Sequence, residues 1–296
     1  MNNSLACEDF QLDRFFSDKF RINRGLDMPV SKAEKAAYND EIKDIKKQVD
    51  NYNSVIRDIL VRKKKMPRIA GYYNLEIATR QMDIIDCCLK INDLSVEMLG
   101  LKNEPFLNNA RKEFYKILQE IEEIVGNQID RSLRENDDYL VNINHLNPRQ
   151  ILEFIQRLHR IFFNLRSSVG EGSKWKWSFV ELQSRVAIIT KNITSFSDLA
   201  KLRDPRMEFY YDRRDLMEMC KEGLTEAAKQ YRTKYELSGK AREDLKKSID
   251  LLAALRKIHV IFGEEEEATK LKNTIDAARL ALEAEDKSIE KEKKNK

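Results

Sequence analysis

The chain has 296 residues, of which 42% are hydrophobic and 35% are charged, with only nine Gly and five Pro. The apolar fraction is too high for a disordered chain, and the low Gly and Pro content disfavours glycine-cradled cofactor folds, sheet-rich sandwiches and collagen-like repeats. The 54 basic and 50 acidic residues nearly cancel, which disfavours a dedicated nucleic-acid binder.

Apolar residues recur at alternating spacings of four and three through most of the chain, which predicts long amphipathic helices. The first segment begins at Ser31, where Glu34 completes a capping-box pattern, and the second ends at Gly100. A third helix begins at Asn103–Pro105, with the proline in its first turn, and is expected to run to about Leu133.

The segment 135–147 carries four Asn and two adjacent Asp and predicts a loop. The next helix begins at Asn147–Pro148, and the Ser167–Lys174 stretch predicts the boundary between two sub-bundles. Asp204–Pro205 ends one helix of the second sub-bundle and starts another. Two further helices and a charged tail complete the chain.

These elements predict an all-α protein, an elongated array of about seven to nine long antiparallel helices in one or two packed bundles. The spacing is that of a coiled coil, but Gly or Pro interrupts it too often for a single rod. The polar residue Asn92 lies on one apolar seam, where it either fixes helix register from a buried position or is exposed. The predicted organisation is an N-terminal amphipathic helix and linker (1–30), a first sub-bundle (31–172), a second sub-bundle (173–286) and a charged disordered tail (287–296).

Few residues are placed for catalysis or metal binding. His145, His159 and His259 belong to no paired-ligand motif, so we expect structural or surface histidines. The four cysteines form no C-x-x-C pair, and we expect reduced thiols that behave as small hydrophobes. Gly170-x-Gly172 lacks the spacing of a phosphate-binding loop. We therefore expect no metal, no cofactor and no catalytic residue.

Two regions combine aromatic and basic residues, which recur together at protein interfaces. Trp177 lies away from the apolar seam of its helix, so it either packs inside the protein or anchors a partner. Three consecutive aromatics near Asp204–Pro205 cannot share one buried stripe, and the acidic residues among them favour a protein partner over nucleic acid. The predicted partner-binding residues are Trp177, Phe209, Tyr210, Tyr211, Arg213 and Arg214.

Five cations lie within seven residues at the end of the first long helix: Arg62, Lys63, Lys64, Lys65 and Arg68. Our preferred interpretation is that they complement the negative end of the helix dipole. The alternative is an anion-binding site for nucleic acid, a membrane surface or an acidic partner.

The N-terminal segment is rich in aromatic residues and predicts a short amphipathic helix, whose apolar residues are Phe10, Leu12, Phe15, Phe16, Phe20 and Ile22. It either caps the bundle or docks into a partner's groove or a second copy of the chain.

The leading hypothesis is a non-enzymatic helical adaptor that binds other proteins, self-association included. The second hypothesis is a nucleic-acid or polyanion binder that uses Arg62–Arg68, and the third is an enzyme with a site between the sub-bundles. No apolar run approaches the length of a membrane span, and we expect a soluble, cytoplasmic protein.

Overall fold

The computed structural model describes residues 30–170, 172–197 and 199–294, and this part of the chain is 84% helical with no strand. The predicted all-α helical array is therefore confirmed. The predicted N-terminal helix, with its four phenylalanines, lies outside the described residues. The α-helices are α2 (Lys32–Glu41), α3 (Lys43–Lys65), α4 (Ala70–Leu99), α5 (Glu104–Val125), α6 (Asn136–Leu140), α7 (Pro148–Val169), α8 (Lys176–Asn192), α9 (Leu199–Arg203), α10 (Tyr210–Leu237), α11 (Arg242–Phe262) and α12 (Glu265–Lys294). Short 3-10 turns are η1 (Pro67–Ile69), η2 (Leu133–Glu135) and η3 (Val141–Ile143).

Side-chain caps explain where several helices begin. The Ser31 hydroxyl accepts a hydrogen bond from the Glu34 backbone N–H at 3.1 Å, and the Glu34 carboxylate accepts one from the Ser31 N–H at 2.9 Å. Asn147 and Gln150 form the same reciprocal pair at the start of α7. Gly100 ends α4 in the left-handed conformation, with φ of 69°. These local signals lie where the sequence predicts them.

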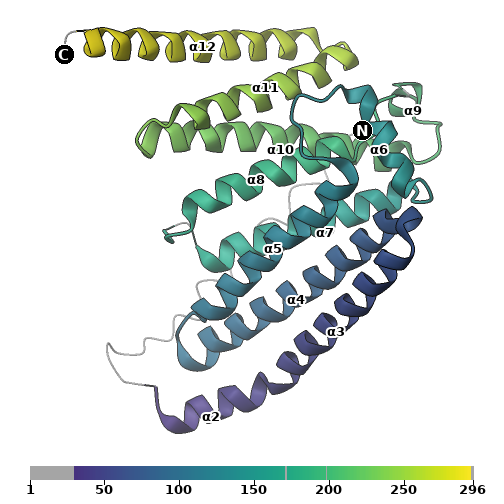
Figure 1. The fold of residues 1–296 in the computed structure, drawn as a ribbon, viewed down its shortest axis with the longest axis vertical. Helices are drawn as coiled ribbons and strands as arrows, with labels where there is room; N and C mark the ends of the chain where they lie inside the picture. The colour runs from purple at the N-terminus through teal and green to yellow at the C-terminus, as the bar shows by residue number, and fades with distance from the viewer. Residues whose placement is uncertain (1–29, 171, 198, 295–296) are drawn as a thin grey trace, which may run out of the picture.

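The long helices follow one another across the molecule nearly in chain order (Figure 1). The most extensive packing joins α4 to α5 and to α3, α8 to α10, α10 to α11, and α11 to α12. Helix α7 packs against α4, α5, α8 and α10, so it connects the two halves of the array. The largest buried cluster contains residues of α4, α5, α7, α8 and α10, so helices before and after residue 172 both contribute to it.

Three local differences from the sequence prediction concern chain ends and turns. Helix α5 ends at Val125, not near Leu133, because Gly126 takes a φ of 72° and leaves the helix. The segment predicted as a loop, 135–147, contains α6 and η3. Helix α12 extends to Lys294, across most of the segment predicted as a tail.

Asn92 is buried, and its side-chain oxygen accepts a hydrogen bond from the Asn103 N–H at 3.0 Å. It therefore fixes the turn between α4 and α5 from inside the protein. Among the described residues, no helix combines the length and the apolar character that crossing a membrane would require.

Candidate functional site

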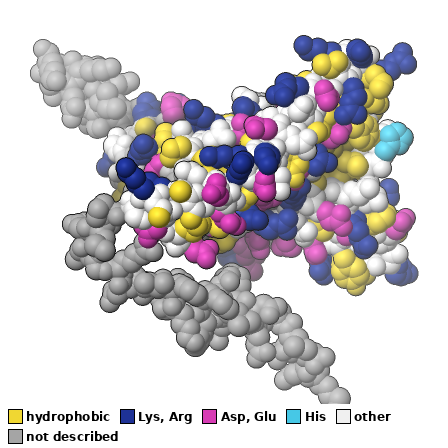
Figure 2. Space-filling model, turned by 90° about the horizontal axis from the view of Figure 1, so that it is seen from below, with side chains coloured by type: hydrophobic (Ala, Val, Ile, Leu, Met, Phe, Trp, Pro, Cys, Tyr) yellow, Lys and Arg dark blue, Asp and Glu magenta, His cyan; other side chains and the backbone are white. Residues whose placement is uncertain are grey.

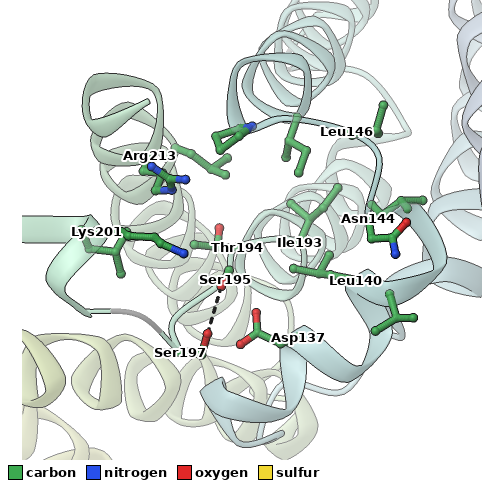
Figure 3. A pocket seen from close by; sticks show the side chains of 16 residues that line it. Asp137, Leu140, Asn144, Leu146, Ile193, Thr194, Ser195, Ser197, Lys201 and Arg213 are labelled. Carbon is green, nitrogen blue, oxygen red and sulfur yellow. Dashed lines mark hydrogen bonds between the residues drawn. The ribbon is translucent and has the colours of Figure 1, made fainter. Parts of the chain in front are cut away.

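A pocket of about 320 Å³ lies where α6, η3, the loop after α8, α9 and the start of α10 meet. Figure 3 shows Arg213 and Lys201 on one side of it and Asn144 and Leu146 on the other. The floor and far wall are largely apolar; they include Leu140, Ile143, Leu146, Ile151, Ile193, Leu202 and Leu216. The polar lining residues are Asp137, Asn144, Thr194, Ser195, Ser197, Lys201 and Arg213.

Asn136 holds one wall of the pocket in place. Its side-chain amide is fully buried and donates hydrogen bonds to the carbonyl oxygens of Lys191 at 2.8 Å and Thr194 at 2.9 Å. The Thr194 hydroxyl in turn donates to the Thr190 carbonyl at 2.7 Å. The start of α6 is thus bonded to the end of α8, and this junction positions Thr194 and the following serine at the pocket.

The opposite wall depends on how α10 begins. Phe209 precedes the helix with a φ of 57°, a left-handed conformation that costs a non-glycine residue about 1–2 kcal/mol. Arg213 follows one turn later, and its guanidinium donates a hydrogen bond to the Glu208 carbonyl. Backbone strain held by surrounding structure is frequent at functional sites. Here the strained residue, Phe209, lies one helical turn before Arg213, whose cation lines the pocket wall.

The rim of the pocket is unusually apolar for a surface that faces water. Val141 of η3 both lines the pocket and is 64% exposed. Its neighbour Tyr139 is also exposed, with the Arg131 guanidinium 3.9 Å from its ring centroid. An exposed apolar rim with cations beside it is the composition found at protein-binding sites.

Among the described residues, the charged side chains that line the pocket are Lys201, Arg213 and Asp137. The Arg213 cation beside an apolar floor suits an apolar group that carries a negative charge. Converging ionisable groups are also what the enzyme hypothesis requires. The Ser195 hydroxyl lies 3.5 Å from the Ser197 hydroxyl.

The structure separates the predicted partner-binding residues. Arg213 lines the pocket, whereas Tyr211 and Arg214 lie further around α10, with the Arg214 guanidinium 5.2 Å from the Tyr211 ring centroid. The rings of Tyr210 and Tyr211 pack edge to face, with their centroids 5.2 Å apart. Trp177 is half-buried and lines a different hollow beside Glu226–Thr233. That hollow lies about 20 Å or more along α10 from Arg213, at a rise of about 1.5 Å per residue.

The basic cluster at the end of α3 is partly occupied by contacts within the protein. Lys63 is paired with Glu120 at 3.3 Å and Glu123 at 2.7 Å, which joins α3 to α5. Arg62 lies 3.8 Å from Glu76. The remaining three cations of the cluster are exposed. Over much of the face drawn in Figure 2, Lys and Arg side chains lie among Asp and Glu side chains rather than in one basic surface.

A buried lysine, whose backbone carbonyl accepts the hydrogen bond from Asn136, is absent from the residues predicted to matter. Lys191 of α8 is 0% exposed, and its ammonium group has no hydrogen-bond partner among the described residues. Burial lowers the pKa of Lys191 to about 8. Burial also raises the pKa of the nearby Cys220 thiol to about 12, so this thiol supplies no counter-charge at neutral pH. The sequence signal that could have identified it is a single lysine inside the largely apolar run 186–193, a pattern that indicates a buried charge.

The three histidines all contact other residues of the protein. The His159 ring nitrogen Nε2 lies 2.9 Å from the Thr190 hydroxyl, and burial lowers the pKa of His159 to about 4. His259 contacts the Glu264 carboxylate, and the His145 backbone N–H donates to the Tyr72 hydroxyl at 2.9 Å. Within the described ranges, no group of three or more His, Cys, Asp or Glu side chains is arranged to hold a metal ion.

A family model described as the TP0443 family matches residues 34–286, which is most of the chain. No curated protein and no solved structure matches it.

Proposed function

The chain belongs to the TP0443 family, and we propose that it is a non-enzymatic helical adaptor whose pocket beside α6 and α10 receives an apolar side chain of a partner protein. The observation that carries the proposal is the coincidence of an exposed apolar rim, at Val141, with the cations Lys201 and Arg213 inside the same pocket.

The volume supports an anchor side chain. At about 320 Å³ the pocket is at the lower end of the range of small-molecule sites, and its mouth is open. Interfaces concentrate their binding energy in a few large side chains that fill such pockets. A partner segment that places one large apolar residue here would bury it against Leu140, Ile193 and Leu216.

The charges indicate what accompanies that anchor. Arg213 places a guanidinium in the described pocket wall, so an acidic residue next to the anchor would find a favourable potential there. The proposed ligand is therefore a protein segment with a large apolar residue next to an Asp or Glu.

A photo-crosslinking experiment tests the site. Val141→p-benzoyl-phenylalanine places the probe at the rim, and Leu237→p-benzoyl-phenylalanine places it at the far end of α10, where the side chain is equally exposed at 66%. Cells that express each variant are irradiated, and the products are treated with nuclease and read by mass spectrometry. We expect a nuclease-resistant protein adduct at position 141 that is absent at position 237.

Arg213 variants make the test specific to the pocket. Arg213→Glu should reduce the adduct at least about tenfold, a loss of about 1.4 kcal/mol, whereas Arg213→Lys, which keeps the charge, should retain most of it. Equal adducts at both probe positions, or an adduct unaffected by Arg213→Glu in a protein with normal helicity, would contradict the proposal.

The second candidate function, polyanion binding, is favoured by the exposure of Lys64, Lys65 and Arg68 at one helix end. It predicts an affinity that falls steeply with salt and is lost when these three cations are changed to Glu. The adaptor proposal predicts that these changes leave the adduct at position 141 unchanged.

A further inference from the structure

A basic and aromatic groove lies along α7, away from the pocket just described. It consists of two adjoining hollows of about 190 and 390 Å³ that share Arg166 in their linings. Trp177 and Phe179 line the smaller hollow together with α10 residues, and Phe162 and Phe163 line the larger one. We call this surface the α7 groove.

The α7 groove carries an excess of positive charge. Among the described residues that line it, Arg160, Arg166, Lys176 and Lys229 are cationic and Glu226 is acidic. Two aromatic side chains are available to a ligand: Phe163 is 69% exposed, and the half-buried Trp177 has the Lys176 ammonium 4.9 Å from its ring centroid. An acidic, aromatic peptide segment would complement both features.

The chain contains such a segment outside the described residues. Residues 8–18, EDFQLDRFFSD, hold four acidic residues and one basic residue, together with three phenylalanines and a leucine. The sign of this charge is opposite to that of the α7 groove, and the phenylalanines match its aromatic lining.

The described chain begins on the side of the array where the α4–α5 turn and the start of α8 lie (Figure 1). The Asn103 side-chain amide donates to the Tyr38 hydroxyl of α2 at 2.8 Å. The neighbouring Lys102 ammonium donates to the Val169 carbonyl at 3.1 Å, at the end of α7 and beside the groove. These contacts connect the start of the described chain to the groove through one turn, and Figure 1 shows α2, the α4–α5 turn and the start of α8 along one side of the array.

The connecting chain is long enough. Residues 19–29 separate the acidic segment from the first described residue, Val30, and eleven residues of extended chain span at most about 40 Å. Three packed helices are about 30 Å across at interaxial distances of 8–10 Å. The segment can therefore reach the α7 groove of its own molecule.

We propose that residues 8–18 dock in the α7 groove of the same chain, with their phenylalanines against Phe163 and Trp177 and their carboxylates among the four cations. The groove is then an internal binding site that a partner can occupy only by displacing this segment. The inference is independent of the function assigned to the pocket beside α6.

Photo-crosslinking of the full-length chain tests the placement. Phe16→p-benzoyl-phenylalanine carries the probe within the segment, and Asn3→p-benzoyl-phenylalanine serves as the control outside it. We expect irradiation of the purified monomer to join residue 16 to peptides that contain residues 159–166 or 226–233. An adduct to other parts of the chain, an adduct found in covalent dimers alone, or equal yields from both probes would overturn the proposal.

Charge reversal separates docking from accidental proximity. Arg160→Glu with Lys229→Glu should reduce the crosslink to the groove about fivefold or more, and 0.5 M salt should reduce it as well, because the charges at the groove edge are exposed and screened. The matched control Lys64→Glu with Lys65→Glu reverses two exposed charges elsewhere and should leave the yield unchanged. A yield that stays the same in the groove variant, with circular dichroism unchanged, would overturn the proposal.

Discussion

Replacement of the buried Lys191 by methionine should stabilise the protein. Its pKa falls from 10.5 to about 8 because burial disfavours the charged form. At pH values below 8, this difference corresponds to a loss of about 3 kcal/mol in the free energy of unfolding. Methionine has a similar shape, carries no charge and fits irregular apolar sites. We therefore expect Lys191→Met to raise the free energy of unfolding at pH 7 by about 2 to 3 kcal/mol.

The pH dependence identifies the cause. Between pH 8 and 10.5 the unfolded chain keeps the lysine proton and the native protein loses it, so the stability of the unmodified protein rises with pH. Of the charged groups around Lys191, Asp130 favours its protonation, whereas Arg131 and Lys257 oppose it. Cys220 stays a neutral thiol over most of this window. The advantage of the methionine variant should therefore shrink to below about 1 kcal/mol at pH 10.5.

Urea unfolding followed by circular dichroism at pH 7 and pH 10 measures both effects. Lys112→Met, on the exposed side of α5, is the matched control and should change stability by less than about 0.5 kcal/mol at either pH. A methionine variant that is less stable than the unmodified protein at pH 7, or whose advantage does not depend on pH, would refute the reasoning.

Three other substitutions test the packing. Burial lowers the pKa of His159 to about 4, so between pH 6.5 and 4 the unfolded chain binds a proton at this residue more readily than the native protein does. The free energy of unfolding should therefore fall by about 2 kcal/mol over this range. His159→Gln should remove much of that loss, which acid unfolding curves measure. Gly71→Ala should cost about 1–3 kcal/mol, because its Cβ would lie 2.7 Å from a carbonyl oxygen of η3, whereas Gly172→Ala, with open space around it, should unfold at nearly the same urea concentration. Lys63→Gln should lower the free energy of unfolding by about 1 kcal/mol, because it removes the ion pairs with two carboxylates that join α3 to α5. Equal urea unfolding midpoints for this variant and for Lys64→Gln would contradict a structural role for these ion pairs.

The fold was largely predictable because its determinants are local. Capping residues such as Ser31 and Asn147, and the glycine that ends α4, act within one turn of the residues that they cap. The regular apolar spacing between these signals defines the buried faces of the long helices. The prediction was wrong at Gly126, where a single left-handed glycine ended α5 earlier than the apolar spacing indicated.

The candidate pocket was not predictable in the same way. Its lining residues come from segments far apart in the chain, such as Asp137, Thr194 and Arg213, and only packing brings them together. The sequence singled out Arg213 because of the aromatic residues before it. In the structure Tyr210 and Tyr211 contact each other, whereas Arg213 lines the pocket. Asn136, which joins two of the pocket walls, lay in a segment predicted as a loop.

The nearly chain-ordered packing has a consequence for local stability. Helix α12 packs mainly on α11, and the small cluster beneath them has six buried members, whereas the central cluster draws on five long helices. In such a one-dimensional arrangement each helix is stabilised chiefly by its neighbours, so opening can start at an edge and stop before the centre. Amide hydrogen exchange should therefore be fastest in α12, slower in α11 and slowest in α4, α5 and α8. The C-terminal edge can then open and close while the pocket beside α6 and the α7 groove keep their shape.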